Sequence, residues 1–306
     1  MRIEPDGTFG AIIASESLGL TETVINGPGG CRDRAHILLG LMIDPEPDAV
    51  ELCSCKNFSK RSGLPCMFIN GNDIVYGASE KIKRTADEIS DVSGKRISVI
   101  ETLGASLICI DYSNIVDTEK GDVVIDEDLS SMSFSEGFDK ATSRILDTHI
   151  RGERHRSDIP SVNILGYCIA DLGWEAGSMQ LIDLLEMMGV KVNANISCRP
   201  TPEQVQSSKD SWLNILIDPA ISRGTAELYS RRYSIPYLRP KEGRPFGVDS
   251  MVSLLREVGQ ALDVDPSPSI DYLMAEADRL HGMMLRAARR IRSLRGRRFS
   301  IEGQSS

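Results

Sequence analysis

The sequence predicts an α/β fold in which two parallel-sheet domains follow one another and a long helix comes after them. Short apolar segments alternate with amphipathic segments through both halves, which is typical of βαβ units and parallel sheets. A polar stretch at 151–160 has no apolar periodicity and separates the two halves. After Pro268 the apolar residues recur at three- and four-residue spacing, which indicates one long helix.

In the first half, apolar and β-branched runs predict strands, and amphipathic runs predict helices. Residues 10–14 form a short apolar opening, and residues 106–110 form a further apolar segment. We expect strands at 23–26, 73–77 and 96–101. We expect helices at 31–41, at 133–149 and around the apolar positions Ile82, Ala86 and Ile89.

The second half restarts the same pattern. We expect strands at 162–167, 191–196 and 212–217, a helix at 178–188 that ends at Gly189, and another helix that ends near Arg232. The long helix should bury one continuous apolar seam, formed by Ile270, Leu273, Ala277, Leu280, Met284, Ala287, Ile291 and Leu294. Its second half carries Arg286, Arg289, Arg290, Arg292, Arg295, Arg297 and Arg298, either as a solvated basic end or as a contact with an acidic partner.

These segments predict four regions in the chain. A first α/β domain covers residues 1–150, a linker covers 151–160, a second α/β domain covers 161–245, and a helical C-terminal segment covers 246–306.

Composition excludes several classes of function. The 306 residues are 41% apolar and 26% charged, which is ordinary for a globular protein. A net charge of −9 and an aromatic content of 5% argue against nucleic-acid binding. Neither a signal peptide nor a membrane-spanning run is evident, so we expect a cytoplasmic protein without a membrane partner. In that compartment the seven cysteines are expected to be thiols or metal ligands instead of disulfides.

The most informative segment is 24–32, where an apolar strand runs into a glycine-rich turn. Ligands of parallel sheets bind beyond the carboxyl ends of the strands, and Cys31 lies there, at the start of the next helix. A helix N-terminus favours a thiolate, which is the ligand of iron–sulfur clusters. Gly27, Gly29 and Gly30 would let the backbone approach a bound group closely.

Further cysteines, Cys53, Cys55 and Cys66, follow the turn. Cys53 and Cys55 would lie on one side of an extended segment, so both could reach a metal. Two alternatives remain: these are loop thiols without a ligand, or the turn binds phosphate beside bystander cysteines. The turn matches neither the GxxxxGKS/T nor the GxGxxG pattern of nucleotide-binding loops.

Six segments carry a family resemblance. Residues 26–31 read Asn-Gly-Pro-Gly-Gly-Cys, residues 73–82 read Asp-Ile-Val-Tyr-Gly-Ala-Ser-Glu-Lys-Ile, and residues 98–111 contain Glu-Thr-Leu. They are followed in order by 134–141, by 162–166 with 185–190, and by 233–237 with 245–248. In these segments the chain resembles the nitrogenase component 1 family, in which a histidine stands at the position of Asn26.

The resemblance implies tandem Rossmann-like, nitrogenase-like domains and a redox role. It implies a [4Fe–4S] cluster at a subunit interface, with ligands from two chains, and electrons from a separate iron-protein reductase that hydrolyses the ATP. Cys31 would be the first ligand, and Cys55 best approximates the family spacing for the second, with Cys53 and Cys66 as alternatives. In a homodimer two cysteines per chain would suffice, although a homologous subunit could also complete the site.

The chain departs from the family pattern in two places. Leu103 stands where the family has its third cysteine, and Cys109, six residues later, is expected to be buried in an apolar segment instead of replacing it. The family carries a third Rossmann-like domain after the long helix, and residues 294–303 look like the first strand of that domain, so we expect a naturally short, a split or a truncated protein.

The short form with few cluster cysteines looks most like the nickel-sirohydrochlorin diamide reductive cyclase group of this family. That likeness implies a tetrapyrrole substrate, whose carboxylates could be bound by Arg199, Arg223, Arg231 and Arg232. Two other functions remain open: a non-catalytic scaffold that holds a metal cofactor, and a truncated homologue without a cluster.

Overall fold

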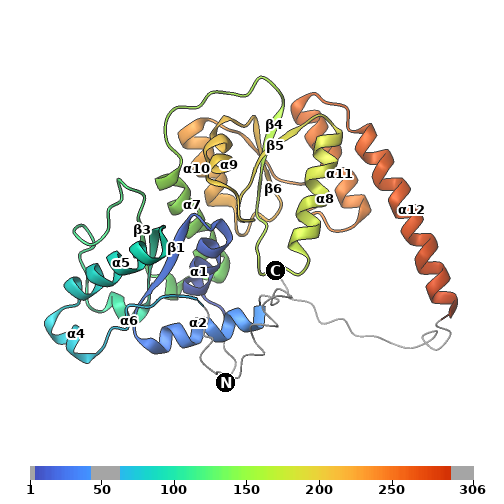
Figure 1. Cartoon of the computed structure of the whole chain (residues 1–306). Coiled ribbons are helices and arrows are strands. Elements are labelled where there is room, and N and C mark those ends of the chain that lie inside the picture. The colour runs from blue at the N-terminus through green and yellow to red at the C-terminus, as the bar shows by residue number, and fades with distance from the viewer. Residues whose placement is uncertain (1–3, 43–62, 291–306) are drawn as a thin grey trace.

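Two parallel sheets lie side by side in the computed structural model, which describes residues 4–42 and 63–290 (Figure 1). The first sheet has the order β1-β2-β3, and its strands are β1 (Thr21–Asn26), β2 (Arg96–Glu101) and β3 (Val123–Ile125). The register pairs Ile25 with Ile100, and Ile100 with Ile125. The carboxyl ends of the three strands therefore meet at one edge.

Helices cover both faces of this sheet. They are α1 (Gly7–Leu18), α2 (Gly29–Met42), α4 (Gly71–Tyr76), α5 (Ser79–Ser93), α6 (Leu103–Ser106) and α7 (Phe134–His149). Ile25, Ile100 and Ile125 pack against the side of α1, α2 and α7, whereas Val24, Val99 and Val124 pack against the side of α5. This alternation follows from the two-residue period of a strand.

The backbones of α1 and α7 touch where the two helices cross. A Cβ atom on Gly137 would lie 2.0 Å from the carbonyl oxygen of Gly7, and one on Gly10 would lie 2.1 Å from that of Phe134. Only glycine fits at such distances, so these residues set the separation of the two helices.

The second sheet has the order β5-β4-β6-β7 and is also parallel. Its strands are β4 (Ser161–Leu165), β5 (Lys191–Asn195), β6 (Leu213–Leu216) and β7 (Tyr237–Leu238). The helices around it are α8 (Trp174–Met187), α9 (Pro202–Ser207), α10 (Arg223–Tyr233), α11 (Val248–Leu262) and α12 (Ser267–Arg290).

Helix α7 joins the two sheets. The Asp139 carboxylate accepts hydrogen bonds from the backbone N–H groups of Gly224, at 2.5 Å, and Thr225, at 2.9 Å, and so caps the first turn of α10. Ile145 of α7 and Tyr229 of α10 belong to one buried cluster. That cluster spans both sheets, so it does not mark where one domain ends and the next begins. The predicted boundaries at 150 and 161 remain predictions.

Most expected elements are confirmed, with boundaries that differ by a few residues, but the strand at 73–77 is wrong. Residues 71–76 form the helix α4, because Asn70 and Asp73 make a reciprocal capping box. The apolar opening at 10–14 lies within α1, and the segment 106–110 is the end of α6 and the turn that follows it.

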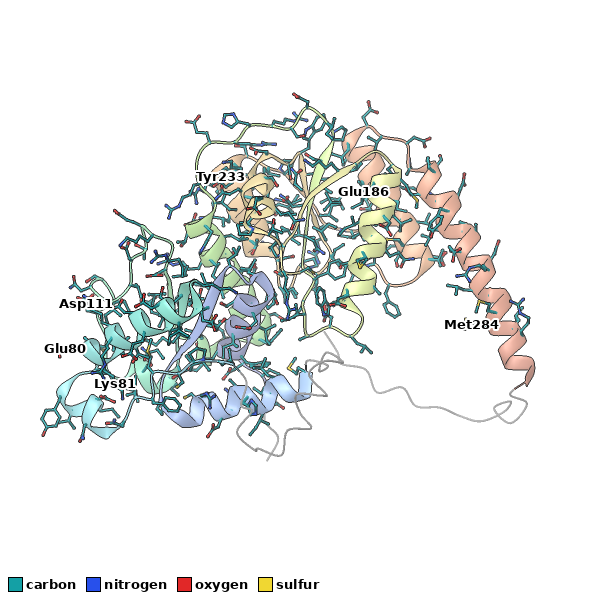
Figure 2. The ribbon with its side chains drawn as sticks, viewed as in Figure 1. Glu80, Lys81, Asp111, Glu186, Tyr233 and Met284 are labelled. Carbon is teal, nitrogen blue, oxygen red and sulfur yellow. The ribbon has the colours of Figure 1, made fainter. Side chains whose placement is uncertain are left out.

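The apolar seam of the last helix is packed only over its first part, while Ile291, Leu294 and the arginines from Arg292 onward lie outside the described residues. Ile270 and Leu273 pack against the cluster formed with α8 and α11, whereas the side chains of Leu280 and Met284 are 49% and 70% exposed. The second part of α12 extends away from the sheet, with Met284 on this part (Figure 2). Within the described ranges, no helix has the length and apolar character needed to cross a membrane.

Candidate functional site

The turn between β1 and α2 places Cys31 at the carboxyl edge of the first sheet. Asn26 ends the strand, Gly27 and Pro28 make the turn, and Cys31 lies in the first turn of α2. The N–H of Cys31 donates to the carbonyl oxygen of Pro28 at 3.0 Å. The Cys31 side chain therefore lies at the N-terminus of α2 and is half-buried.

Cys66 reaches the same turn through backbone pairing. The N–H of Ile25 donates to the oxygen of Pro65 at 2.9 Å, and the N–H of Met67 donates to the oxygen of Ile25 at 3.0 Å. This register runs the chain alongside β1 and brings the Cys66 Sγ to 3.4 Å from the Gly27 oxygen and 4.0 Å from the Pro28 oxygen. The structure therefore brings Cys31 and Cys66 to one turn.

Burial raises the pKa of the Cys66 thiol. A hydrogen bond from the Phe68 N–H, at 3.4 Å from Sγ, and the charge of Arg32 both act to lower this pKa, while the Cys31 thiol nearby acts to raise it. Without a metal, Cys66 is a neutral thiol that donates to the Gly27 oxygen. A metal ion bound there would displace that proton.

The three glycines of the turn have different surroundings. A Cβ atom on Gly27 would lie 2.1 Å from Thr102 Oγ1, so Gly27 permits the close packing of the turn on the start of α6. A Cβ atom on Gly29 would contact the Phe68 ring at 3.4 Å, and one on Gly30 would meet no atom within 4 Å. Of the three glycines, Gly30 alone has open space beside its backbone. Contact of Gly27, Gly29 and Gly30 with a cofactor remains a prediction.

A cavity of about 220 Å³ adjoins Cys31 on the α2 face. Its wall includes Ile25, Thr102 and Leu103, and an ion pair of 2.6 Å between Arg34 and Asp6 lies on it. The Leu103 side chain, at the position of the expected third cysteine, is 59% exposed. The residue after Thr102 therefore faces the same space as Cys31.

A buried polar cluster at this edge was missed by the sequence reasoning. Asn26 Nδ2 donates to the Tyr112 hydroxyl at 2.5 Å, and that hydroxyl donates to the Glu101 carboxylate. All three residues are less than a tenth exposed. The available signal was Glu101 itself, a charged residue at the end of an apolar strand in register with Asn26.

The other cysteines among the described residues do not join this pair. Cys53 and Cys55 lie outside the described residues. Cys109 was expected to be buried, which is wrong: the turn after α6 has a φ of 51° at Cys109 and leaves it exposed. Cys168 and Cys198 lie at the second sheet, where burial raises the pKa of each to about 12 and keeps both as thiols.

The donor set at the turn fits half of a cubane cluster. Such a cluster takes four thiolates, and Cys31 and Cys66 supply two. In the part of the chain that the structure describes, no group of three or more cysteine, histidine or acidic residues could hold a metal ion. The remaining ligands would have to come from a second chain or from Cys53 and Cys55.

The arginines expected to bind substrate carboxylates do not converge. Arg223 pairs with Glu227 on the same helix at 3.0 Å. Arg232 pairs with Asp147 at 2.5 Å and so holds α10 against α7. Arg231 also lies on α10, whereas Arg199 follows β5 and donates its backbone N–H to the Ser17 oxygen at 2.7 Å.

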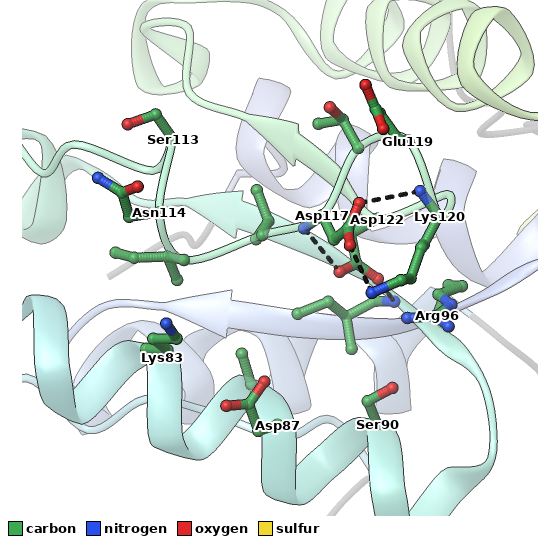
Figure 3. A pocket seen from close by; sticks show the side chains of 15 residues that line it. Lys83, Asp87, Ser90, Arg96, Ser113, Asn114, Asp117, Glu119, Lys120 and Asp122 are labelled. Atoms are coloured by element: carbon green, nitrogen blue, oxygen red, sulfur yellow. Dashed lines mark hydrogen bonds and ion pairs between the residues drawn. The ribbon is translucent and has the colours of Figure 1, made fainter.

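A larger cavity, of about 530 Å³, lies between α5 and the loop 113–120, at the amino end of β2 (Figure 3). Its acidic groups are engaged: Asp117 pairs with Lys120 at 2.7 Å, and Asp122 accepts hydrogen bonds from two backbone N–H groups. These contacts hold the loop on the sheet. Because ligands of parallel sheets bind at the opposite edge, this cavity is not the candidate site.

Comparison with known proteins supports a common ancestry over nearly the whole chain. The family described as "Nitrogenase component 1 type Oxidoreductase" matches residues 7–305. The nitrogenase molybdenum-iron protein alpha chain of Clostridium pasteurianum is 28% identical over 204 residues, which are 64% of this chain and 36% of that protein. A light-independent protochlorophyllide reductase subunit of Nostoc punctiforme is 22% identical over 222 residues, which are 67% of this chain and 42% of that protein.

A third relative is the nitrogenase iron-molybdenum cofactor biosynthesis protein NifE of Methanococcus maripaludis, 29% identical over 61% of this chain and 39% of that protein. The chain thus spans 36% to 42% of the length of these relatives. The solved structure "Nitrogenase Cp1 at pH 5" has the same fold, with a TM-score of 0.67 and 22% identity over 89% of this chain and 54% of that one. The chain belongs to the nitrogenase component 1 type oxidoreductase family.

Proposed function

We propose that this chain is a redox subunit that receives single electrons from an ATP-dependent iron-protein reductase and delivers them to a bound substrate. The observation that carries the proposal is the meeting of Cys31 and Cys66 at one turn, at the ligand-binding edge of a parallel sheet. These two thiols would hold a [4Fe–4S] cluster, which supplies one-electron storage and transfer when bound.

The proposed assembly is a homodimer. In a homodimer whose twofold axis lies beside the turn, two thiols from each chain would give the four that a cubane cluster needs. Cys66 takes the place of Cys55 as the favoured second ligand, because its Sγ already lies beside the turn. Cys55 and Cys53 remain alternatives, and a homologous subunit could take the place of the second copy.

We assign reductase docking to an exposed apolar surface near the turn, formed by α4 and α6. Ile74, Val75 and Tyr76 of α4 are 56%, 72% and 86% exposed, and Leu103 and Leu107 of α6 and the turn after it are also exposed. Apolar side chains gathered on a surface mark interaction sites. Lys81 of α5 holds α4 in place, because its ammonium contacts the Asp73 carboxylate at 2.6 Å and the Phe68 oxygen at 2.7 Å.

The proposed substrate class is a tetrapyrrole. The support is the relationship to subunits of light-independent protochlorophyllide reductases, which stand alongside nitrogenase chains among the relatives. The likeness to the nickel-sirohydrochlorin cyclase group belongs to the same proposal. The reducing cytoplasm is the proposed compartment, in keeping with the free thiols of the described cysteines.

Replacing Tyr76 with alanine tests the docking surface. We expect electron transfer from an iron-protein reductase to slow by about tenfold, as for the loss of an aromatic anchor at an interface. Because Tyr76 is 86% exposed, the melting temperature should not change. Stopped-flow measurement of ATP-dependent reduction of the iron-loaded chain gives the rate.

The matched control is Val92→Ala, because Val92 is 90% exposed on α5, outside the surface formed by α4 and α6. It should leave the rate unchanged. Equal rates for the wild type and Tyr76→Ala would contradict the docking assignment. An iron-loaded chain that no reductase reduces in the presence of ATP would contradict the proposed function itself.

A second candidate is a scaffold that holds a metal cofactor without turning over substrate. The relationship to NifE, a cofactor biosynthesis protein, and the leucine at position 103 favour it. Tight retention of a metal cofactor by a chain that shows no turnover with the reductase would select this function over the first.

A further inference from the structure

The ends of the three strands in the first sheet place three polar residues side by side. Asn26 of β1 and Glu101 of β2 are register partners, and the pairing of Ile100 with Ile125 places Asp126 next to Glu101. By the alternation of side chains along a strand, all three point toward the α5 face. Tyr112 reaches the same place from the loop after α6.

This cluster contains one buried hydrogen-bond acceptor without a partner among the described residues. Asn26 Nδ2 donates to Tyr112, and Tyr112 donates its single hydroxyl proton to Glu101 Oε2. Asn26 Oδ1 is fully buried and finds no hydrogen-bond partner among the described residues. A buried acceptor without a donor is costly, and a proton on the Glu101 carboxyl, which is linked to Asn26 through the Tyr112 hydroxyl, would add a donor to this cluster.

The surroundings of Glu101 favour that proton. The residue is 7% exposed, and burial raises its pKa, because the ionised form loses its hydration. Asp126 adds like-charge repulsion in the same direction, while the hydrogen bond from Tyr112 acts to lower the pKa. Asp126 and Tyr112 are the titratable groups that act on Glu101 from the neighbouring elements.

The cluster is tied to the cysteine turn by a short covalent and hydrogen-bonded path. The backbone oxygen of Asn26 accepts the N–H and the Oγ1 hydroxyl of Thr102, both at 3.0 Å. Thr102 follows Glu101 directly and lines the cavity beside Cys31 on the opposite face. One layer of backbone therefore separates the cluster from the proposed redox site, and the low dielectric of the interior carries charge effects across it.

We infer that Glu101 is the proton acceptor that accompanies reduction at the cysteine turn. This inference rests on the proposed function. If a cluster held at the turn takes up one electron from the reductase, the Glu101 carboxylate would take up one proton from solvent, so that the net charge of the buried region stays constant. When the cluster returns its electron to the substrate, Glu101 would release that proton to solvent. Tyr112, which donates to the carboxylate, and Asn26, which donates to Tyr112, are positioning residues.

The test is the pH dependence of the midpoint potential of the iron-loaded chain, measured by redox titration between about pH 5 and about pH 9. Because the reduced state holds the proton more tightly, the potential of the wild type should fall with rising pH over part of this range. The limiting slope is about 59 mV for each tenfold change in proton activity. In Glu101→Gln, which is neutral at every pH, the slope should vanish.

Two further variants separate this role from a purely structural one. Tyr112→Phe removes the hydrogen bond that lowers the Glu101 pKa, so the sloping region should move to higher pH. Glu16→Gln is the matched control, because burial also raises the pKa of Glu16, which lies on α1 away from the strand ends. It should keep the wild-type slope. A flat wild-type profile, or an unchanged slope in Glu101→Gln, would overturn the inference.

Infrared spectroscopy of the metal-free chain distinguishes this inference from the proposed function. A carboxylic acid band that persists well above the usual glutamic acid pKa of about 4.3, and is absent in Glu101→Gln, would establish the proton site. If that band is present and the chain takes up no iron, the proposed function and the redox coupling both fail while the proton site stands. If the band is missing, the inference is wrong even where iron is bound.

Discussion

Replacing Cys31 with alanine is expected to reduce iron and sulfide uptake, on anaerobic reconstitution, by about tenfold or more. Loss of a residue that merely supports a ligand already costs 10- to 100-fold in metal affinity, as an order of magnitude, so loss of a direct ligand should cost at least as much. The metal-free protein should keep its melting temperature, because Cys31 is only half-buried and donates no side-chain hydrogen bond that the fold needs. Iron analysis and calorimetry measure the two effects.

Cys109→Ala is the matched control for this experiment, because Cys109 is an exposed thiol of the same domain. It should retain the wild-type iron content. Cys66→Ala should lose iron as Cys31→Ala does if Cys66 is the second ligand; retention of iron there, with its loss in Cys55→Ala, would move the second ligand to Cys55. Full iron content in Cys31→Ala would contradict the site.

Replacing Gly137 with alanine is expected to destabilise the protein by about 3 kcal/mol or more. Its Cβ would lie 2.0 Å from the Gly7 oxygen and 2.4 Å from the Gly7 Cα, so α1 and α7 would have to separate. Overpacking against side chains costs about 1–3 kcal/mol, and here the obstacle is backbone, which gives way less easily. Chemical denaturation of the metal-free chain measures the change in the free energy of unfolding.

Gly40→Ala serves as the control for the helix-propensity effect of the same substitution. Gly40 lies in α2, and its added Cβ would meet no atom within 4 Å. The change should therefore stabilise the protein by up to about 1 kcal/mol. If Gly137→Ala were as mild as Gly40→Ala, the close crossing of α1 and α7 would be contradicted.

The parts of the fold that could be predicted are those with a strong local pattern. Residues 96–101 contain Ile97, Val99 and Ile100, and residues 191–196 alternate polar residues with apolar ones. These segments form β2 and β5 within one residue of the expected ends. The helix at 133–149 was also expected, and in the structure Ser133 and Glu136 form a capping box at its start.

Other elements could not be predicted because tertiary contacts decide them. Helix α1 is buried on nearly every side, so its apolar residues show no helical period. The strand β3 has three residues, which is too short for a periodic signal. The helix α4 exposes Ile74 and Val75, so a run that resembles a buried strand lies on the surface, and the decisive signal was the polar pair Asn70 and Asp73.

The candidate site also has a part that the local sequence predicts and a part that only tertiary contacts decide. The turn and Cys31 could be found from local residues, because glycine and a helix start are visible in the sequence. Cys66 was one of three alternatives, since only the pairing of residues 65–69 with β1 selects it. The cluster of Asn26, Glu101 and Tyr112 joins residues up to 86 positions apart, and no local pattern reveals such a contact.

The most direct test of a cluster shared between two chains is the iron and acid-labile sulfide content per chain, with an EPR spectrum of the reduced state, on protein prepared without oxygen. We expect about two irons and two sulfides per chain and a cubane signal, because one cluster would be shared by two chains. About four irons per chain would place a whole cluster in each subunit and require Cys53 and Cys55 as ligands. Absence of iron after anaerobic reconstitution would contradict the proposed redox site.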